Sequence, residues 1–231
     1  KADLILIAPA SANFIAKLAQ GLADDLLSNV CLARNCPILI APSMNKNMWE
    51  NSATKRNISL IIEDGGKFSG PENGEQACGD EGMGRLVNEK ILLLDIRKSL
   101  SPPLLENKNI LITCGATFEK IDDARAITNL SSGKMGFSLA DEAYSMGANV
   151  TLIYGRTETL PQANIRCIYA PNHEMMKKLV KQHAKDNDIF ISSAAISDYI
   201  PKTVSGKLKK HKDKLILELN RSSDIILETA S

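Results

Sequence analysis

The sequence lacks long apolar runs and any excess of charge of one sign. Its longest apolar runs, among them residues 4–10, are far shorter than the roughly 20 residues needed to cross a bilayer. The 28 basic and 27 acidic residues leave a formal net charge of +1. Such a balance produces no broad field that attracts nucleic acid or a membrane surface. We therefore expect neither partner, and instead small molecules and other subunits.

Paired cysteines are also missing. The number of cysteines is odd and their spacing fits no metal site; they are Cys31, Cys36, Cys78, Cys114 and Cys167. A scattered, odd set is typical of reduced thiols in the cytoplasm. The sequence therefore predicts a cytoplasmic protein and assigns no metal ligand.

The composition is that of a folded protein. With 231 residues, 44% hydrophobic and 24% charged, the chain can bury one large core or two modest ones. A buried-type strand begins soon after Lys1, and residues 224–231 open a helix without a stop signal. We expect a fragment of a longer protein, cut at both ends.

Apolar runs alternate with amphipathic stretches along the chain. The runs predict strands over residues 4–8, 37–41, 60–62, 109–113, 150–153, 165–169 and 189–192. Helices are predicted after Ser11 as cap, around Asn45 to Trp49, and over residues 89–100, 136–147 and 173–185. Residues 63–88, rich in Gly, Asn, Glu and Asp, predict a long irregular segment. The alternation predicts an α/β fold with parallel, doubly wound sheets.

Two consecutive prolines indicate a domain boundary. Pro102 and Pro103 prevent helix continuation and stiffen the chain. We predict a first unit over residues 1–100, a linker over residues 101–108 and a second unit over residues 109–231, each an incomplete doubly wound sheet.

The first candidate site follows the strand predicted over residues 37–41. Asn45 falls on the first turn of a short helix, where its amide and free backbone N–H groups can hold a carboxylate. A simpler interpretation is that Met44, Met48 and Trp49 are core residues and Asn45 is a helix cap. Cys78 lies on a polar, Gly-rich loop, where it is either an acid in a closed site or an ordinary free cysteine.

Taken together, the motifs of the first unit resemble those of the flavin-dependent phosphopantothenoylcysteine decarboxylases. The residues that carry this resemblance are Ala8-Pro9-Ala10-Ser11-Ala12-Asn13, Ala23-Asp24-Asp25-Leu26-Leu27, Pro42-Ser43-Met44-Asn45, Met48-Trp49, Ala77-Cys78-Gly79-Asp80 and Gly84-Arg85.

The resemblance implies a flavodoxin-like fold that binds FMN and decarboxylates 4'-phosphopantothenoylcysteine. Asn45 would hold the departing carboxylate and Cys78 would protonate the enethiolate, while Ser11, Asn13 and Met44 would contact the flavin. The family's catalytic His and flavin-phosphate loop precede the first motif, and this chain begins after them. We therefore expect residues 1–231 alone to have little decarboxylase activity.

The second candidate site is the loop before the helix predicted over residues 136–147. Its residues are Ser131, Ser132, Gly133 and Lys134, whose backbone amides can hold phosphate oxygens. The spacing is neither that of a Walker loop nor that of a dinucleotide fingerprint. A capped helix start with a solvated Lys134 is the simpler alternative.

The motifs of the second unit resemble those of phosphopantothenate:cysteine ligase. They are Asp122, Arg125, Thr128-Asn129-Leu130-Ser131-Ser132-Gly133-Lys134-Met135-Gly136, Ala194-Ala195-Ile196-Ser197-Asp198-Tyr199, Lys207-Leu208-Lys209-Lys210 and Ser223-Asp224-Ile225. Three positions depart from the family's pattern: Cys114, Ala116 and Phe118.

This second resemblance implies a Rossmann-like unit that uses CTP, with Mg²⁺ bridging the triphosphate, to join 4'-phosphopantothenate to cysteine through an acyl-cytidylate. Asn129 would position the acyl intermediate, and Lys207 would neutralise phosphate, although Lys207 alone is also explained as a solvated surface lysine. Ala194 and Asp198, with the loop over residues 131–134, would bind the nucleotide and substrate.

The two resemblances in series predict a bifunctional enzyme of coenzyme A synthesis that forms homo-oligomers. The alternative from another class is a non-catalytic flavin-binding or assembly module of the same fold. Asn45 and Cys78 favour the enzyme, because flavin binding alone does not require them. An NAD-dependent oxidoreductase is disfavoured because no dinucleotide fingerprint follows a predicted strand.

Overall fold

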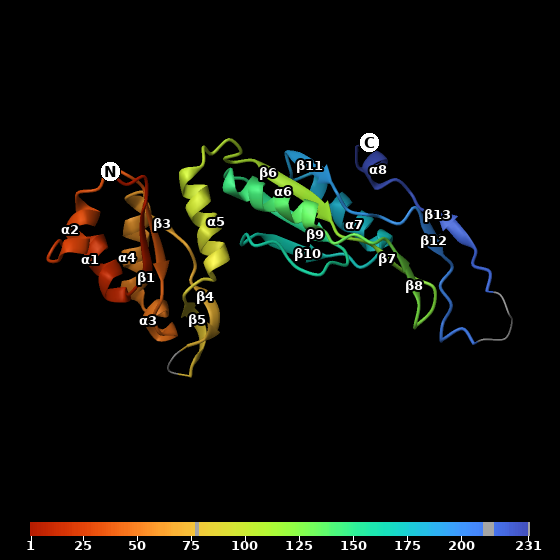
Figure 1. Cartoon of the computed structure of the whole chain (residues 1–231), viewed down its shortest axis with the longest axis horizontal. Coiled ribbons are helices and arrows are strands. Elements are labelled where there is room, and N and C mark those ends of the chain that lie inside the picture. Colours follow the sequence, from red (N-terminus) through yellow and green to blue (C-terminus); the bar gives the residue numbers. More distant parts are fainter. Residues whose placement is uncertain (77–78, 210–214, 231) are drawn as a thin grey trace. The chain divides into compact units, whose positions relative to one another are not determined.

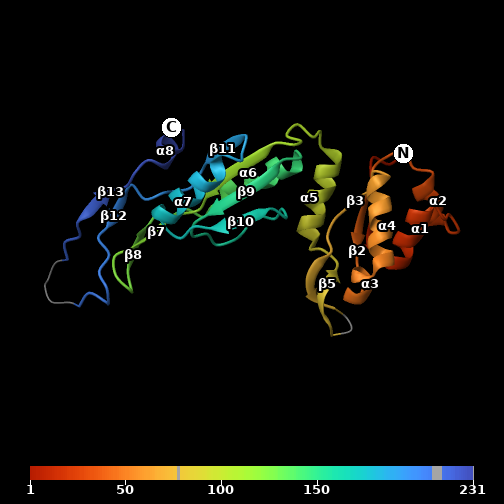
Figure 2. The same cartoon turned by 180° about the vertical axis from the view of Figure 1, so that it is seen from behind.

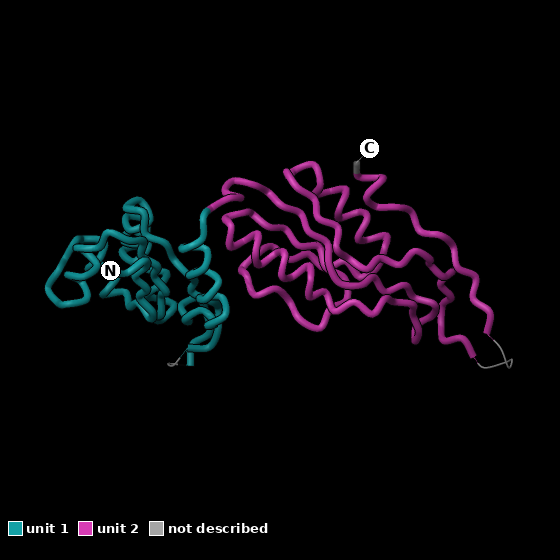
Figure 3. The backbone as a smooth tube through the Cα atoms, turned by 45° about the horizontal axis from the view of Figure 1, so that its top comes forward, with its two compact units in different colours: residues 1–102 teal, residues 103–231 magenta. Residues whose placement is uncertain are grey.

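The computed structural model describes residues 1–76, 79–209 and 215–230. The chain divides into two compact units, residues 1–102 and residues 103–231 (Figure 3). The division falls within the segment predicted as a linker. Residues 103–108 belong to the second unit, where the Leu105 backbone N–H donates to the Met146 carbonyl over 3.0 Å.

The first unit is built on a three-stranded parallel sheet in the order β1-β2-β3 (β1 and β3 in Figure 1, β2 in Figure 2). The strands are β1 (Ile5–Ala10), β2 (Ile38–Pro42) and β3 (Lys67–Phe68), and all five residues of β2 are buried. The helices are α1 (Ala12–Gln20), α2 (Leu26–Leu32), α3 (Lys46–Glu50), α4 (Ser52–Glu63) and α5 (Glu89–Leu100). Ile7, Ile15, Ile40 and Ile61 pack in the core between sheet and helices.

Short polar side chains set the helix starts of this unit. Ser11 caps α1 as predicted, since its hydroxyl accepts the Phe14 N–H over 3.2 Å. Gly21 ends α1 with a φ of 66°, a conformation that glycine adopts without strain.

The strand predicted over residues 60–62 is wrong, because these residues form the last turns of α4. Asn51 caps that helix by accepting the Ala53 N–H over 2.9 Å. Ile58 and Ile61, three residues apart, face the core, whereas Ile62 is 55% exposed. The segment predicted as irregular contains β3 and an antiparallel hairpin of β4 (Glu72–Glu75) and β5 (Glu81–Arg85).

The second unit is built on a four-stranded parallel sheet in the order β10-β9-β6-β11 (labelled in Figure 1 and seen from behind in Figure 2). The strands are β6 (Asn109–Cys114), β9 (Asn149–Tyr154), β10 (Arg166–Tyr169) and β11 (Ile189–Ser192). The helices are α6 (Lys134–Ser145), α7 (His173–Ala184) and α8 (Ile225–Ala230).

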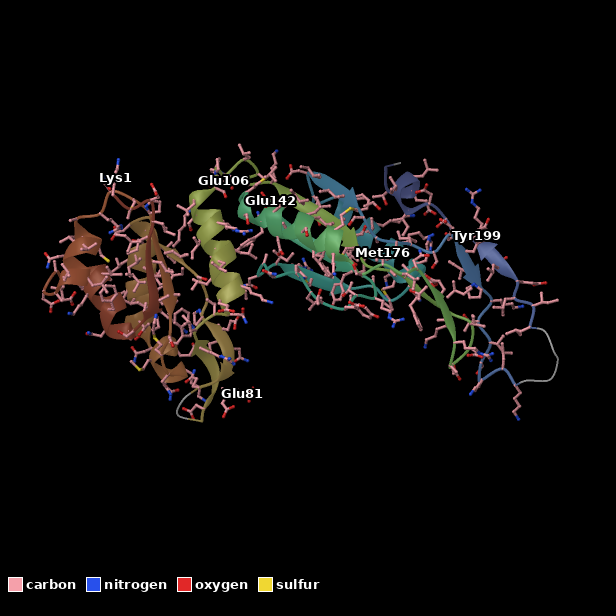
Figure 4. The ribbon with its side chains drawn as sticks, viewed as in Figure 1. Lys1, Glu81, Glu106, Glu142, Met176 and Tyr199 are labelled. Carbon is pink, nitrogen blue, oxygen red and sulfur yellow. The ribbon has the colours of Figure 1, made fainter. Side chains whose placement is uncertain are left out.

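The two long helices cover opposite faces of this sheet. Ile110 and Ile112 of β6 pack against α6, and the intervening Leu111 packs in the cluster that contains Met176 of α7 (Figure 4). The chain runs outward from β6 to β9 and β10, then returns to β11 on the other side of β6. The connections leaving β6 and β11 therefore diverge, and such a point is where open α/β sheets bind ligands.

Two antiparallel hairpins extend from the carboxyl edge of the second sheet. One consists of β7 (Phe118–Lys120) and β8 (Ala126–Thr128), the other of β12 (Tyr199–Pro201) and β13 (Leu219–Arg221). Tyr199, the first residue of β12, is 55% exposed (Figure 4). Within the described ranges, no helix is both long and apolar enough to span a bilayer.

Candidate functional site

In the first unit, the carboxyl ends of β1 and β2 meet at one edge of the sheet. Ala10 pairs with Pro42, and the Ser43 N–H donates to the Ala10 carbonyl over 3.0 Å. Ser11 and Asn13 follow β1 on the first residues of α1, while Met44 and Asn45 follow β2. The sequence-predicted flavin and carboxylate residues therefore come from adjacent strand ends.

The side chain of Asn45 is a helix cap, the simpler of the two interpretations of the sequence, and it also bonds to a carboxylate of the same unit. Its Oδ1 caps α3 by accepting the Asn47 N–H over 2.8 Å. Its Nδ2 donates to the Asp80 carboxylate over 3.2 Å. Asn45 is half-buried, so this donor is directed at a carboxylate in a partly dry environment.

The β4–β5 hairpin forms the other wall of this site. The Lys46 N–H donates to Gln76 Oε1 over 3.0 Å, and Gln76 Nε2 donates to the Met83 carbonyl over 3.2 Å. The Met44 N–H donates to the Gly84 carbonyl over 2.9 Å, and a Cβ on Gly84 would lie 2.2 Å from the Met44 oxygen. Only glycine permits so close an approach.

A pocket of about 650 Å³ lies between these elements. Its lining includes Ser43, Met44, Asn45, Gln76 and Val87. Cys78 lies outside the described residues. Gln76 and Asp80 stand two residues before and after it in the sequence. Gln76 accepts the Lys46 N–H, and Asp80 accepts the Asn45 amide.

In the second unit, Asn129 lies at the divergence between β6 and β11. It follows β8, and its Nδ2 donates to the carbonyls of Ala195 over 3.1 Å and Ile196 over 3.2 Å. Both carbonyls belong to the segment that leaves β11. Among the hydrogen bonds of the described residues, Asn129 Oδ1 accepts none, and the side chain belongs to an exposed residue.

The predicted phosphate loop leads into α6 at the same edge. Gly133 has a φ of 77° and is the cap residue of α6, without a side-chain cap. The N–H groups of Gly133 and Lys134 donate to the hydroxyls of Ser131 and Ser132 over 3.3 and 3.5 Å. A pocket of about 370 Å³ is lined by residues 130–136 and Ser193. The loop, the helix start and the segment after β11 are therefore adjacent.

A larger pocket, of about 880 Å³, contains Ala194 and Asp198 in its lining, together with Arg221 and Ser223. Asp198 is exposed, and its carbonyl accepts the Ser222 N–H over 2.8 Å. Ala194 and Asp198 thus lie beside the Asn129 contacts in sequence but line a different pocket from the loop over residues 131–134.

Lys207 is not brought beside Asn129 in this structure. It is exposed, and the residues on either side of it are attached to the turn between β7 and β8. Asp122 Oδ2 accepts the Leu208 N–H over 3.0 Å, and Arg125 Nη2 donates to the Leu208 carbonyl over 2.7 Å. Asn129 lies four residues beyond Arg125, roughly 13 Å along an extended strand.

Asp122 is the strongest electrostatic feature of this turn. Its side chain is fully buried and accepts two hydrogen bonds from the Arg125 guanidinium, over 3.0 and 2.6 Å. The Arg125 hydrogen bonds hold the pKa of the Asp122 carboxyl well below its usual range, opposed by burial.

The sequence alone missed several residues that build these sites. Gln76 and Thr117 have no motif of their own, and Thr117 is fully buried beside Ser197. Cys114, one of the departures from the family pattern, lies in the core under α6. Burial raises the pKa of its thiol to about 12, so Cys114 is a packing residue and not a nucleophile.

Comparison with known proteins identifies both units. The family model described as Flavoprotein matches residues 1–100, and the model described as DNA/pantothenate metabolism flavoprotein C-terminal domain matches residues 105–231. The chain is 42% identical to the coenzyme A biosynthesis bifunctional protein CoaBC of Vibrio vulnificus (strain YJ016), over 100% of this chain and 58% of the relative. It is 43% identical to the protein of that name from Bacillus subtilis (strain 168), over 98% of this chain and 57% of the relative.

Among solved structures, the C-terminal domain of a coenzyme A biosynthesis bifunctional protein CoaBC is 39% identical, with a TM-score of 0.47, over 54% of this chain and 58% of that chain. A TM-score below 0.5 adds nothing to the family match. The chain spans 58% of the length of the Vibrio relative. The chain belongs to the DNA/pantothenate metabolism flavoprotein family, with a Flavoprotein region followed by the family's C-terminal domain.

Proposed function

We propose that this protein performs two consecutive reactions of coenzyme A biosynthesis. Its second unit couples 4'-phosphopantothenate to cysteine, and its first unit decarboxylates the 4'-phosphopantothenoylcysteine produced. One observation supports both assignments: each unit opens a pocket at the carboxyl edge of its parallel strands, and residues of that unit's motif line the pocket. The names of the curated relatives support the same pathway.

For the decarboxylase, we propose that Asn45 Nδ2 holds the substrate carboxylate. The Asp80 carboxylate now accepts this N–H, and a substrate carboxylate would take its place. An amide suits this role because it donates without titrating near neutral pH. We assign Cys78 as the acid that returns a proton to carbon after carbon dioxide leaves.

The pocket beside Asn45 suits FMN by its chemistry. Met44 and Val87 offer apolar surface to a flat ring, and Ser43 and Gln76 offer polar atoms to its edge. Ser11 and Asn13, at the start of α1, are not among the residues that line this pocket, and we assign them to the flavin from their place after β1, the strand beside β2. FMN, when bound, supplies the reversible oxidation that makes the carboxylate labile.

For the ligase, we propose that the carboxylate of 4'-phosphopantothenate attacks the α-phosphorus of CTP and expels pyrophosphate. The cysteine amine then attacks the acyl carbon and expels CMP. The loop over residues 131–134 and the first amides of α6 suit phosphate oxygens, and Asn129 Oδ1 suits an N–H donor such as the attacking amine. We assign Ala194 and Asp198 to the nucleotide and Lys207 to phosphate.

Magnesium would enter this reaction with the nucleotide. Across residues 1–76, 79–209 and 215–230, no group of three His, Cys, Asp or Glu side chains is arranged to hold a metal ion. We therefore place Mg²⁺ on the triphosphate oxygens of CTP, as part of the substrate. The strand order of the second sheet, which is that of the first strands of a Rossmann-type fold, supports nucleotide binding here.

The test uses the protein as its gene encodes it. We expect the purified protein to be yellow with bound flavin, to release pyrophosphate from CTP when given 4'-phosphopantothenate, and to form the amide when cysteine is added. It should then release carbon dioxide from that product. A colourless protein that also leaves CTP intact with these substrates would exclude the proposal.

A further inference from the structure

Thr117 joins three segments at the carboxyl edge of the second sheet. It is fully buried in the loop after β6. Its N–H donates to the Ala195 carbonyl over 3.3 Å, and its hydroxyl accepts the Ser197 N–H over 2.9 Å and donates to the Ser197 hydroxyl over 3.2 Å. Its carbonyl accepts the Thr128 hydroxyl over 2.8 Å.

The Thr117 hydroxyl takes the place of a backbone acceptor at the end of the pairing between the segments that follow β6 and β11. Between β6 and β11, the Ser193 N–H donates to the Thr113 carbonyl and the Ala195 N–H to the Gly115 carbonyl, over 3.1 and 2.7 Å. Two residues further, the acceptor for the Ser197 N–H is the Thr117 side chain. Ser197 is 3% exposed, so without this hydroxyl its N–H would be buried and unpaired.

Thr117 holds both the segment to which the Asn129 side chain bonds and the segment that carries Asn129. The Asn129 amide donates to the Ala195 carbonyl, which also accepts the Thr117 N–H. It donates as well to the Ile196 carbonyl, which belongs to the same peptide group as the Ser197 N–H held by the Thr117 hydroxyl. The backbone that carries Asn129 is held at the preceding residue, Thr128, by the Thr117 carbonyl. We propose that Thr117 is a positioning residue that fixes Asn129 Oδ1 where it accepts an N–H of the cysteine amine while that amine attacks the acyl carbon. This inference rests on the proposed ligase function.

Thr113 provides a matched control four residues away. It is 1% exposed at the end of β6, and its Oγ1 has no hydrogen-bond partner among the described residues. The substitution Thr→Val is nearly isosteric at both positions. It removes the two hydrogen bonds to Ser197 at position 117, and only an unpartnered hydroxyl at position 113.

The experiment separates the two half-reactions in the protein as its gene encodes it. Pyrophosphate release from CTP and 4'-phosphopantothenate reports activation, and product formed on adding cysteine reports amide formation. In Thr117→Val we expect activation to stay within about threefold of wild type, and amide formation to fall about tenfold to a hundredfold, as misplacement of a site residue causes. Thr117→Ser should restore amide formation and Thr113→Val should leave both steps unchanged.

Other outcomes would overturn the positioning role. These are wild-type amide formation in Thr117→Val, an equal loss of both half-reactions, or no rescue by serine. In the Asn129→Ala background, Thr117→Val should cause no further loss, because both substitutions then act on the same step; additive losses would contradict the proposal. If Thr117→Val does not fold, Thr117→Ala removes the same hydroxyl with a smaller side chain and tests the same contact with the Ser197 N–H.

Hydrogen exchange at the Ser197 amide distinguishes failure of this proposal from failure of the proposed function. We expect exchange about tenfold faster in Thr117→Val than in wild type or Thr113→Val, since its buried acceptor is lost. Unchanged exchange would overturn the contact whatever the protein catalyses. If Thr117→Val exchanges faster as expected but the wild-type protein never consumes CTP, the ligase assignment is overturned, and with it the role of Asn129.

Discussion

The two units use the same side chain in opposite ways. In the first unit, Asn45 Oδ1 is used by the protein to cap α3, and Nδ2 is directed at the Asp80 carboxylate. In the second unit, Asn129 Nδ2 is used by two backbone carbonyls, and Oδ1 accepts from none of the described residues. One site therefore offers a donor, which suits a carboxylate, and the other offers an acceptor, which suits an amine.

The largest effect is expected from removing the acceptor in the second unit. Asn129→Ala should slow amide formation about a hundredfold, the usual cost of losing one well-placed polar group in a reaction site, while pyrophosphate release from CTP continues. The measurement is the ratio of amide formed to pyrophosphate released over the same interval.

Asn187→Ala is the matched control for that variant. The Asn187 amide also donates to a backbone carbonyl, that of His183, over 2.7 Å, but it lies after α7 and lines none of the three pockets described above. It should leave the ratio unchanged. Undiminished amide formation in Asn129→Ala would contradict the acceptor role of Asn129 and so remove its contrast with Asn45.

The donor of the first unit is tested by Asn45→Asp. The new carboxylate still caps α3, because aspartate is as good a cap as asparagine, but it places negative charge opposite Asp80 and removes the N–H donor. Carbon dioxide release should fall about tenfold or more, a loss in the range expected for one missing charge-stabilising donor. The flavin absorbance should persist.

Asn51→Asp makes the same change at a helix cap to which no ligand role is assigned. Asn51 caps α4 through its Oδ1, which accepts the Ala53 N–H over 2.9 Å. Added negative charge at a helix N-terminus is favourable, so this variant should be as stable and as active as wild type. Equal loss in both variants would mean that helix charge, and not the donor to a carboxylate, decides the activity.

A smaller effect is expected from the thiol assigned as the acid. Cys78→Ser should slow proton return about tenfold, less than the roughly hundredfold or more typical of a lost general acid, because serine keeps a hydroxyl proton. The decarboxylated intermediate should accumulate before product. Cys36→Ser, which alters a half-buried thiol in the same unit, is the control. Prompt product release from Cys78→Ser would leave the first unit with a carboxylate site but no assigned acid.

Pattern alone located β1 and β2 of the first sheet and all four strands of the second, but not β3, nor β8, which precedes Asn129. Strand β11 and helix α5 have their predicted bounds, because apolar periodicity and caps are local properties of the sequence. The residues 60–62 were predicted as a strand because three apolar residues fit either structure, and only the distant cap at Asn51 decides for a helix. Gln76 and Thr117 were missed since their partners lie 30 and 80 residues away.

The smallest effect concerns two carboxylates that contrast as the asparagines do. Asp80 accepts from the exchangeable Asn45 amide, whereas buried Asp122 holds Arg125 and the Leu208 N–H beside Lys207. The pKa of Asp122 is lowered, chiefly by Arg125, so its stabilising contribution is present above the ordinary carboxyl pKa of about 3.9 and is lost as pH falls through the folded value. Asp122→Asn should therefore unfold the second unit at a lower urea concentration at pH 7, and the difference should shrink below about pH 4.

The chain supplies its own probes for this measurement. Its one tryptophan, Trp49, lies in the first unit, and its tyrosines all lie in the second, so tryptophan fluorescence and tyrosine absorbance follow the two units separately. Only the tyrosine transition should move in Asp122→Asn. Asp123→Asn, which removes the charge from the exposed acceptor of the Gly206 N–H, should move it less. The urea midpoints of Asp122→Asn and wild type could instead differ by a constant amount from pH 7 to about pH 3. That result would show that the shape of the Asp122 side chain, and not the charge of a carboxyl with a lowered pKa, holds residues 206–208.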